Sequence, residues 1–271
     1  MSFFMIILVS LVQGITEFLP VSSSGHLVLL PILTDQPYQG RTIDVAAHVG
    51  TLFAVMFFLR VEITRIVIGI GSFGRHNKSD ARLGLMLIAA TIPVIVAGFY
   101  VNYANWNWLT AIETLAWSNL IFAGLLWGAD RYGVTVNNMK TMRFSSAIFI
   151  GFAQVFALVP GASRSGVTMT AARIFGFDRV TAARFSLLLS LPTIAGAGIL
   201  KTKDLVSDGD LVLGGDAVLV TLFSGLLAFI AMRAMIAWLA RANFNIFVYY
   251  RLVLGIVLLW AVQTNLITQM V

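Results

Sequence analysis

The stretch QGITEFLPVSSSGH, residues 13–26, decides how this chain folds, because Pro20 and a cluster of polar groups break an otherwise apolar helical run. A second break of the same kind, PGASRSGVT, spans residues 160–168. Together the two breaks hold a carboxylate, an imidazole, a guanidinium and several hydroxyls. A central Arg or Asp in a membrane helix costs about 2.5–3.5 kcal/mol on insertion scales, so such groups usually mark a functional site. This combination suits a ligand that carries phosphate.

The composition is that of a polytopic membrane protein. Hydrophobic residues make up 59% of the chain, charged residues only 11%, and the mean hydropathy is +0.90, which leaves too little polar surface for a soluble fold. The 271 residues accommodate six or seven spans of about 20 residues, with little left for a domain outside the bilayer. Without cysteine, disulfides, thiolate catalysis and Cys-ligated metals are excluded. Residues 1–12 lack the basic start of a signal peptide and are expected to belong to the mature fold.

Charge-free windows predict six transmembrane helices, at residues 44–60, 84–103, 109–129, 185–200, 217–238 and 250–269. Two further apolar stretches, 3–19 and 145–159, run into the breaks, and short helical pieces at 24–33 and 166–176 follow them. These pieces are too short to span alone, and the breaks would expose unpaired backbone to lipid unless protein surrounded them. The sequence therefore predicts an all-α membrane protein with two re-entrant helix-loop-helix hairpins.

The order of these elements is hairpin, three spans, hairpin, three spans. Because an odd number of spans separates the hairpins, they must enter from opposite faces of the membrane, with tips that meet near the midplane. We expect one membrane domain, 1–271, built as an inverted repeat with halves at about 1–130 and 144–271. Both breaks have Pro followed three residues later by Ser (Pro20 and Ser23, Pro160 and Ser163), a short pattern that chance could also produce, so the order of the apolar segments carries the argument.

The basic residues predict the orientation. If both termini share one face, only Arg41, Lys201 and Lys203 of the 18 Lys and Arg residues join them there. Because basic loops stay cytoplasmic, the termini and the pocket are expected to face outward. The net charge of +6 has the same origin and gives no indication of nucleic-acid binding. The opposite face collects Arg60, Arg65, Arg75, Lys78, Arg82, Arg131, Lys140, Arg143, Arg173, Arg179, Arg184, Arg233, Arg241 and Arg251.

In the first break, Gln13 and Glu17 are four residues apart, so on a helix they share one face and can converge on one ligand or cation. Glu17 could instead cap backbone or pair with a buried Arg. A hard cation such as Mg²⁺ prefers few carboxylates together with phosphate oxygens, so one Glu with a pyrophosphate could suffice. No site made only of protein ligands is visible in the sequence.

The run Ser22, Ser23, Ser24 precedes the next helical piece, so one serine is expected to cap that helix while backbone N–H groups attract phosphate. A serine hydroxyl needs an adjacent base to attack phosphorus, and His26 is the nearest candidate by sequence. Spacing does not identify the attacking serine. A lone histidine in a helix can also be structural.

In the second break, Arg164 can grip phosphate oxygens through two nitrogens and stabilise charge during phosphoryl transfer. An ion pair with Glu17 across the repeat interface is the other interpretation, and the two are compatible without a ligand. Ser163, Ser165 and Thr168 would add donors, or would serve as caps and interhelical hydrogen bonds. Elsewhere, Asp44 and His48 share a helical face at the start of the first span, where an interfacial helix start also explains them.

At these residues the chain resembles the undecaprenyl-pyrophosphate phosphatase family of the bacitracin-resistance type, over essentially its whole length. The first family motif, Glu-or-Gln, three residues, Glu, then Pro-Val-Ser-Ser-x-Gly-His, is matched by Gln13, Glu17 and residues 20–26. The second, Pro-Gly-x-Ser-Arg-Ser-x-x-Thr, is matched by residues 160–168. Many members have Glu where this chain has Gln13, so Glu17 must carry any charged role alone.

The resemblance implies hydrolysis of a C55 polyprenyl pyrophosphate to the monophosphate and inorganic phosphate. It also implies a divalent cation, Mg²⁺ or Ca²⁺, a dimer in the bacterial inner membrane, an outward-facing site and recycling of the lipid carrier of cell-wall synthesis. By resemblance, Ser23 is the nucleophile, His26 the base or the group that orients it, Glu17 the cation ligand or acid-base residue, and Arg164 the pyrophosphate clamp. The expected substrate-binding residues are Gln13, Ser22, Ser24, Gly161, Ser163, Ser165 and Thr168.

Two other functions compete with this one. Inverted repeats with broken helices also build transporters, so a polyprenyl-phosphate flippase is the main alternative, and it could coexist with hydrolysis. The phosphatidic acid phosphatase superfamily also has Ser-Gly-His and Ser-Arg elements, but it needs a Lys-rich first motif and a later catalytic His. No histidine follows His76 in this chain, which disfavours that family.

Overall fold

A computed structural model describes residues 1–34, 36–104, 111–207 and 214–264. Within these residues the protein is all-helical, with eleven α-helices and no sheet. The helices are α1 (Phe3–Thr16), α2 (Ser23–Thr34), α3 (Arg41–Phe58), α4 (Arg60–Gly71), α5 (Lys78–Ala104), α6 (Ile112–Tyr132), α7 (Phe144–Ala153), α8 (Arg164–Ile174), α9 (Arg179–Ser207), α10 (Gly215–Leu239) and α11 (Asn245–Gln263). A 3₁₀-helix, η3 (Gln154–Leu158), continues α7, and a second one, η2, spans Met139–Thr141.

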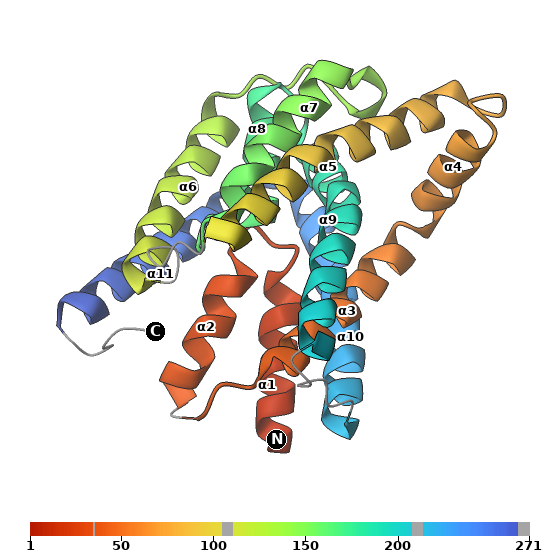
Figure 1. The fold of residues 1–271 in the computed structure, drawn as a ribbon. Coiled ribbons are helices and arrows are strands. Elements are labelled where there is room, and N and C mark those ends of the chain that lie inside the picture. The colour runs from red at the N-terminus through yellow and green to blue at the C-terminus, as the bar shows by residue number, and fades with distance from the viewer. Residues whose placement is uncertain (35, 105–110, 208–213, 265–271) are drawn as a thin grey trace.

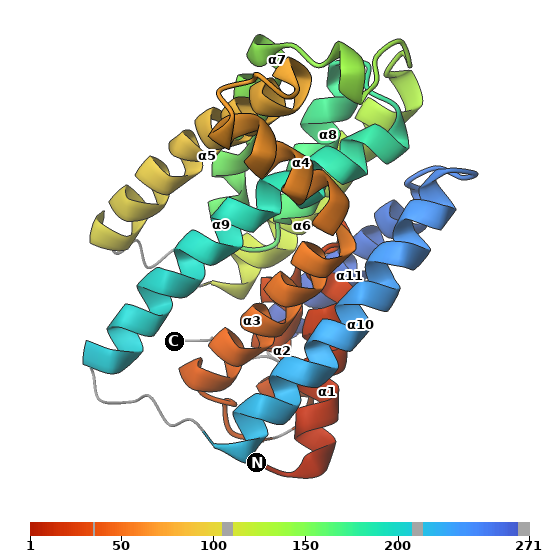
Figure 2. The same cartoon turned by 90° about the vertical axis from the view of Figure 1, so that its right-hand side faces the viewer.

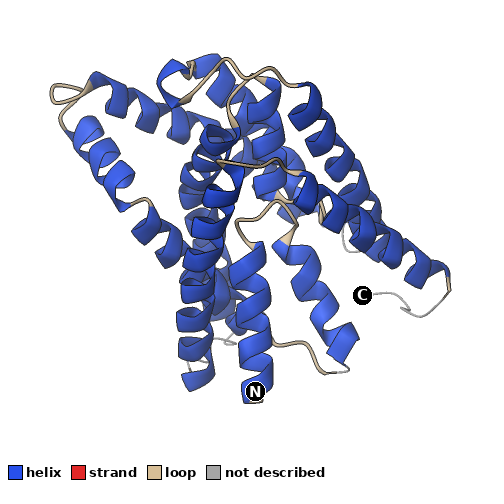
Figure 3. Ribbon diagram, turned by 180° about the vertical axis from the view of Figure 1, so that it is seen from behind, coloured by secondary structure: helices blue, strands red, loops and turns tan. Residues whose placement is uncertain are grey.

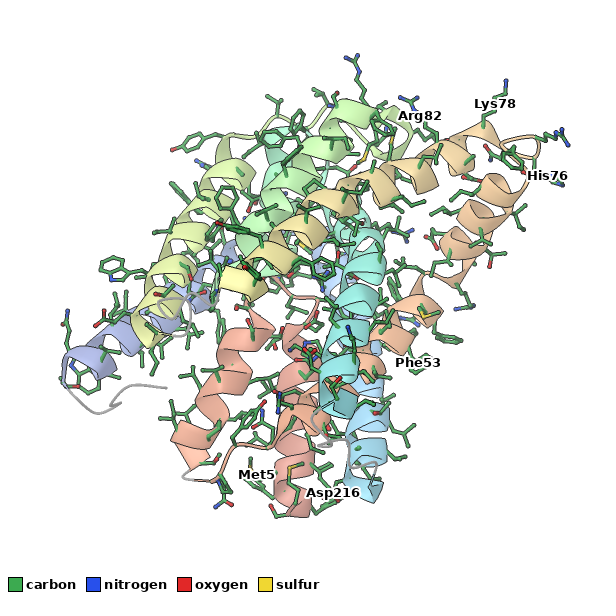
Figure 4. The ribbon with its side chains drawn as sticks, in the orientation of Figure 1. Met5, Phe53, His76, Lys78, Arg82 and Asp216 are labelled. Atoms are coloured by element: carbon green, nitrogen blue, oxygen red, sulfur yellow. The ribbon has the colours of Figure 1, made fainter. Side chains whose placement is uncertain are left out.

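Five of the described helices are long and apolar enough to cross a membrane: α3, α5, α9, α10 and α11. Large apolar side chains on their outer faces are exposed, for example Phe53, which is 61% exposed and points away from the bundle in Figure 4. Such faces are expected to contact lipid rather than water. The chain is therefore a multi-pass membrane protein.

The predicted spans agree with these helices except at α6, which is more polar than expected, and at α4, which was not predicted. The span at 109–129 corresponds to α6, whose Glu113, Asn119 and Asp130 make it more polar, and α6 is not among the five. Positions 109–110 of that span, and 265–269 of the last one, lie outside the described residues. The helix α4 was missed, because its alternating charged and apolar residues contain no charge-free window.

Two pairs of short helices, α1 with α2 and α7 with α8, stand at the predicted breaks and come from opposite ends of the molecule, and we call these pairs the two hairpins (Figure 1). In Figures 1 and 3, α1 and α2 rise from the end that holds the N-terminus, while α7 and α8 descend from the other end. The pieces break where the sequence predicted, since α1 ends at Thr16 ahead of Pro20 and η3 ends at Leu158 ahead of Pro160. Their tips meet in the middle of the bundle.

Each hairpin packs against a long helix of the other half of the chain. The first hairpin's α1 lies along α10, and the second hairpin's α7 lies along α5 (Figure 2). Gly14 permits the first of these contacts, because a Cβ atom there would lie 2.7 Å from the Leu227 Cβ and 2.8 Å from the Ser224 carbonyl oxygen. Small residues of this kind let membrane helices approach closely. The two halves are therefore interlocked.

Basic residue types lie at the end of the bundle where α4 meets α5. His76, Lys78 and Arg82 lie at the α4–α5 connection, opposite the end that holds Met5 and Asp216 (Figure 4). Arg251 departs from the predicted loop position, because it is fully buried in α11. A charge-free window cannot distinguish a loop arginine from one that enters the protein interior.

Candidate functional site

The hairpin tips are held together by side chains from several helices. Ser165 Oγ donates to the Leu19 carbonyl oxygen at 2.8 Å, which joins the second tip to the first. Arg251 donates to the Gly161 and Ala162 carbonyl oxygens at 2.9 and 3.0 Å and to the Pro20 carbonyl oxygen at 3.4 Å. One buried guanidinium therefore satisfies backbone groups of both tips, which the lipid could not do.

Both tips end on a serine with left-handed backbone, Ser22 with φ 71° and Ser163 with φ 69°. Non-glycine residues rarely adopt this conformation, so its recurrence marks a shared constraint. If Ser22 is treated as equivalent to Ser163, the segment SSSG (residues 22–25) aligns with SRSG (residues 163–166), which lies 141 positions later. The first residues of α1 and α7 have the same separation. The shared Pro-to-Ser spacing of Ser23 and Ser163 does not correspond to this alignment, because the second tip has one more residue between its proline and the equivalent serine.

This alignment makes Ser23 and Arg164 equivalent, as the first residues of α2 and α8, and Glu17 joins them. Ser23 Oγ donates to Glu17 Oε2 at 2.7 Å, and Arg164 Nη2 donates to Glu17 Oε1 at 2.7 Å. Gln13 Nε2 donates to Glu17 Oε2 at 3.0 Å from one helical turn earlier. Glu17 is 8% exposed, so the first hairpin presents two donors and the second hairpin one donor to a buried carboxylate. The ion pair considered for Arg164 is present.

Two polar atoms beside Glu17 are buried without a hydrogen-bond partner in the described residues: Gln13 Oε1, an acceptor, and Arg164 Nη1, a donor. A buried unpaired polar atom costs about 1–3 kcal/mol, so two in one cluster call for an explanation. An anion would satisfy the guanidinium nitrogen, and a cation or donor would satisfy the amide oxygen. The site is therefore suited to a ligand that brings both, such as a phosphate with its counter-ion.

His26 lies outside this cluster, contrary to its predicted position beside the attacking serine. Its Nδ1 donates to the Ser22 carbonyl oxygen at 2.7 Å, so Nε2 of the neutral ring accepts from the Tyr250 hydroxyl at 2.5 Å. The two rings also stack, with centroids 5.6 Å apart. Both ring nitrogens are thus engaged away from Ser23. The bond to the carbonyl of Ser22, four residues earlier and just before α2, turns the imidazole away, and proximity in the sequence could not show this.

Among the histidines, His48 of α3 approaches Glu17 instead, with its Nε2 atom 3.8 Å from Glu17 Oε2. Its Nδ1 donates to the Asp44 carbonyl oxygen at 2.7 Å, which orients the ring. His48 also lines a cavity of about 660 Å³ between α3 and α9, whose other lining residues are mostly apolar. The sequence placed His48 one turn after Asp44 but gave no signal that α3 packs beside the first hairpin.

The remaining predicted binding residues shape the tips more than they face Glu17. Ser163 Oγ accepts from the Gly166 N–H at 3.2 Å as a helix cap, and Thr168 Oγ1 lies 2.7 Å from Ser186 Oγ in α9. Ser24 is exposed and lies 3.5 Å from Ser22 Oγ. Gly161 has φ 90°, and a Cβ atom there would overlap the Leu115 carbonyl oxygen and Ser118 Oγ. These residues thus fix the backbone that positions Ser23 and Arg164.

The donor set fits a divalent cation held jointly by protein and ligand. No group of three or more His, Cys, Asp or Glu residues within the described ranges could hold a metal alone. Glu17 and the unpaired Gln13 Oε1 atom offer hard oxygen ligands, and Mg²⁺ commonly takes its other ligands from water and phosphate. The residues therefore suit a cation that arrives with a phosphate.

Comparison with known proteins agrees with the sequence resemblance. The family model described as bacitracin resistance protein BacA matches residues 6–257. A protein of Ruegeria pomeroyi named undecaprenyl-diphosphatase is 43% identical over 262 residues, which cover 96% of this chain and 98% of the relative. Proteins of the same name from Alcanivorax borkumensis and Alteromonas mediterranea are each 42% identical, over 96% and 97% of this chain and 99% of each relative. Because these matches cover nearly the whole chain, the protein belongs to the BacA family.

Proposed function

We propose that this protein hydrolyses undecaprenyl diphosphate to undecaprenyl phosphate and inorganic phosphate, and so recycles the lipid carrier of cell-wall synthesis. The names of relatives with 42–43% identity support this activity. The structural observation that carries the proposal is the Glu17 carboxylate, which is shared by Ser23 of one hairpin and Arg164 of the other. A nucleophile, a base and a guanidinium in one buried cluster are the groups that phosphoryl transfer requires.

The proposed membrane arrangement has α6 as a sixth span and the two hairpins as re-entrant elements of an inverted repeat. Two observations support this arrangement. Each hairpin packs on a helix of the other half of the chain, α1 on α10 and α7 on α5. Equivalent residues of the two tips are also separated by the same 141 positions in the sequence. The excess of basic residues on the α4–α5 side supports an outward-facing pocket in the inner membrane. The homodimer implied by the resemblance remains a prediction.

In the proposed reaction the pyrophosphate lies between the hairpin tips, with terminal phosphate oxygens against Arg164 Nη1. Ser23 Oγ forms a bond to the terminal phosphorus while its proton passes to Glu17, 2.7 Å away. The bond from that phosphorus to the bridging oxygen breaks, and its electrons leave with undecaprenyl phosphate. Water then cleaves the phosphoserine to release inorganic phosphate. Direct attack by water is the alternative, and a trapped phosphoserine would distinguish the two.

The apolar cavity beside His48 supports a lipid as the substrate. It lies between α3 and α9 and shares His48 with the surroundings of Glu17, so an isoprenoid chain in it would leave the pyrophosphate at the tips. Glu17 and Gln13 would hold the divalent cation, which when bound would neutralise phosphate charge.

Phosphate release from C55 pyrophosphate by the purified protein in detergent tests the proposal, with and without chelator. The wild type should release phosphate only with the cation, and Glu17→Gln, which keeps the size of the side chain and an acceptor for Arg164, should lose activity by orders of magnitude while its melting temperature shows a folded protein. Release by Glu17→Gln at the wild-type rate would remove the Glu17 carboxylate from the mechanism. Lipid movement across liposomes without any phosphate release would favour the flippase instead.

A further inference from the structure

A polar cavity that is lined by none of the hairpin-tip residues has no role in the reaction proposed above. It encloses about 250 Å³ and is lined by Trp127, Asp130, Arg131, Arg179, Asn243 and Asn245. These residues come from the end of α6, the start of α9 and the connection from α10 to α11. That connection lies at the end of the bundle away from the N-terminus (Figure 2). We call this cavity the α6–α11 pocket.

The one acidic residue of the pocket is already used by the protein. Asp130 Oδ1 accepts from Arg173 Nε at 3.1 Å and from Arg179 Nε at 2.8 Å, and Oδ2 accepts from the Phe244 N–H at 3.3 Å. Arg173 is 2% exposed, and its other two nitrogens donate hydrogen bonds to backbone carbonyl oxygens and to the Thr135 hydroxyl. Asp130 and Arg173 therefore neutralise each other, and Asp130 does not repel an anion from the pocket.

The other two arginines keep donors free for a ligand. Arg179 uses only Nε on Asp130, and its side chain is 36% exposed, so its two terminal nitrogens remain available. Arg131 is exposed and makes no ion pair or hydrogen bond with any other residue of the described chain. With Asp130 and Arg173 in balance, the pocket carries an excess of two positive charges. Guanidinium groups are the preferred partners of phosphate oxygens.

The surroundings match the headgroup layer of a membrane. Trp127 lines the pocket and packs edge-on against Tyr132, with ring centroids 5.9 Å apart, and both rings are exposed. Exposed Trp and Tyr pairs at the end of a membrane helix are typical of the interface between lipid and water. Asn243 and Asn245 also line the pocket, and Asn243 Oδ1 accepts from the Asn245 N–H at 3.1 Å at the start of α11.

We propose that the α6–α11 pocket binds the phosphate of an anionic membrane phospholipid, with Arg131 and Arg179 as its ligands. Basic pockets between transmembrane helices are suited to such headgroups, and each arginine near the surface contributes about fivefold in affinity. The acyl chains would lie along the exposed apolar face of α6. The pocket is separate from the Glu17 cluster, so the proposal stands independently of the catalytic one.

Native mass spectrometry of the full-length protein in mixed micelles tests this, with phosphatidylglycerol as the anionic lipid and phosphatidylcholine as the neutral one. Arg131→Ala should weaken retention of phosphatidylglycerol about fivefold, and Arg131→Lys should restore part of it. The matched control is Arg82→Ala, which removes one exposed arginine at the same end of the molecule but outside the pocket. It should leave retention unchanged.

Two results would overturn the proposal. An equal loss of phosphatidylglycerol from Arg131→Ala and Arg82→Ala would mean that general surface charge, rather than this pocket, holds the lipid. Displacement of all bound lipid by inorganic phosphate at a concentration similar to that of the lipid would identify a site for the free anion instead of a headgroup.

Discussion

Replacing Arg164 by lysine separates the two tasks that the structure gives to this side chain. Arg164 Nη2 bonds Glu17 Oε1 at 2.7 Å, while Nη1 is buried without a partner and would meet the phosphate. Lysine keeps the charge but has a single nitrogen, which can remain on Glu17 or bind phosphate but cannot span both. Losing one donor to a developing anion costs about 10²–10³ in kcat, or about 2.7–4 kcal/mol.

The measurement is phosphate release from C55 pyrophosphate in detergent, with the melting temperature recorded in parallel. Arg164→Lys should lower kcat by about 10²–10³ with a smaller change in KM, because the lost contact matters most in the transition state. Lysine is preferred to alanine because removal of one partner of a buried ion pair destabilises by about 3–5 kcal/mol and would confuse the result. Arg82→Lys, at an exposed position, is the matched control. A wild-type kcat in Arg164→Lys would refute the assignment of Nη1 to the phosphate.

Three further predictions concern the hairpin tips. Ser23→Ala should abolish phosphoserine trapping and lower kcat by orders of magnitude. The control Ser24→Ala, at an exposed serine, should leave kcat near that of the wild type. An equal loss of kcat in the two variants would disprove a special role for Ser23. Arg251→Met should lower the melting temperature by several degrees, because each carbonyl left without a donor costs about 1–3 kcal/mol; an unchanged melting curve would contradict the clamp. Gly161→Ala should destabilise the second tip, since its φ of 90° and the overlap with Ser118 both oppose a side chain, and thermal unfolding in detergent measures this.

Hydropathy predicted the large features of the fold well, because membrane-spanning segments must be apolar and broken helices must be covered by protein. The two hairpins and the meeting of Glu17 with Arg164 follow from that constraint and from the order of the spans. The polar α6 and the amphipathic α4 were harder to place, since neither has a long charge-free window.

What the sequence could not supply was the packing between helices. Periodicity tells which face of α3 carries His48 but not that this face lies beside Glu17. The burial of Arg251 and the bond from His26 to Tyr250 depend in the same way on α11 crossing both hairpin tips, more than 200 residues after the first hairpin.

The most direct test of the central claim, that both hairpins build one site around Glu17, is an experimental structure with a non-hydrolysable methylene analogue of the lipid pyrophosphate. The terminal phosphonate should lie within hydrogen-bond distance of Ser23 Oγ and Arg164 Nη1. An analogue bound with its phosphonates away from one of these two residues would contradict the claim.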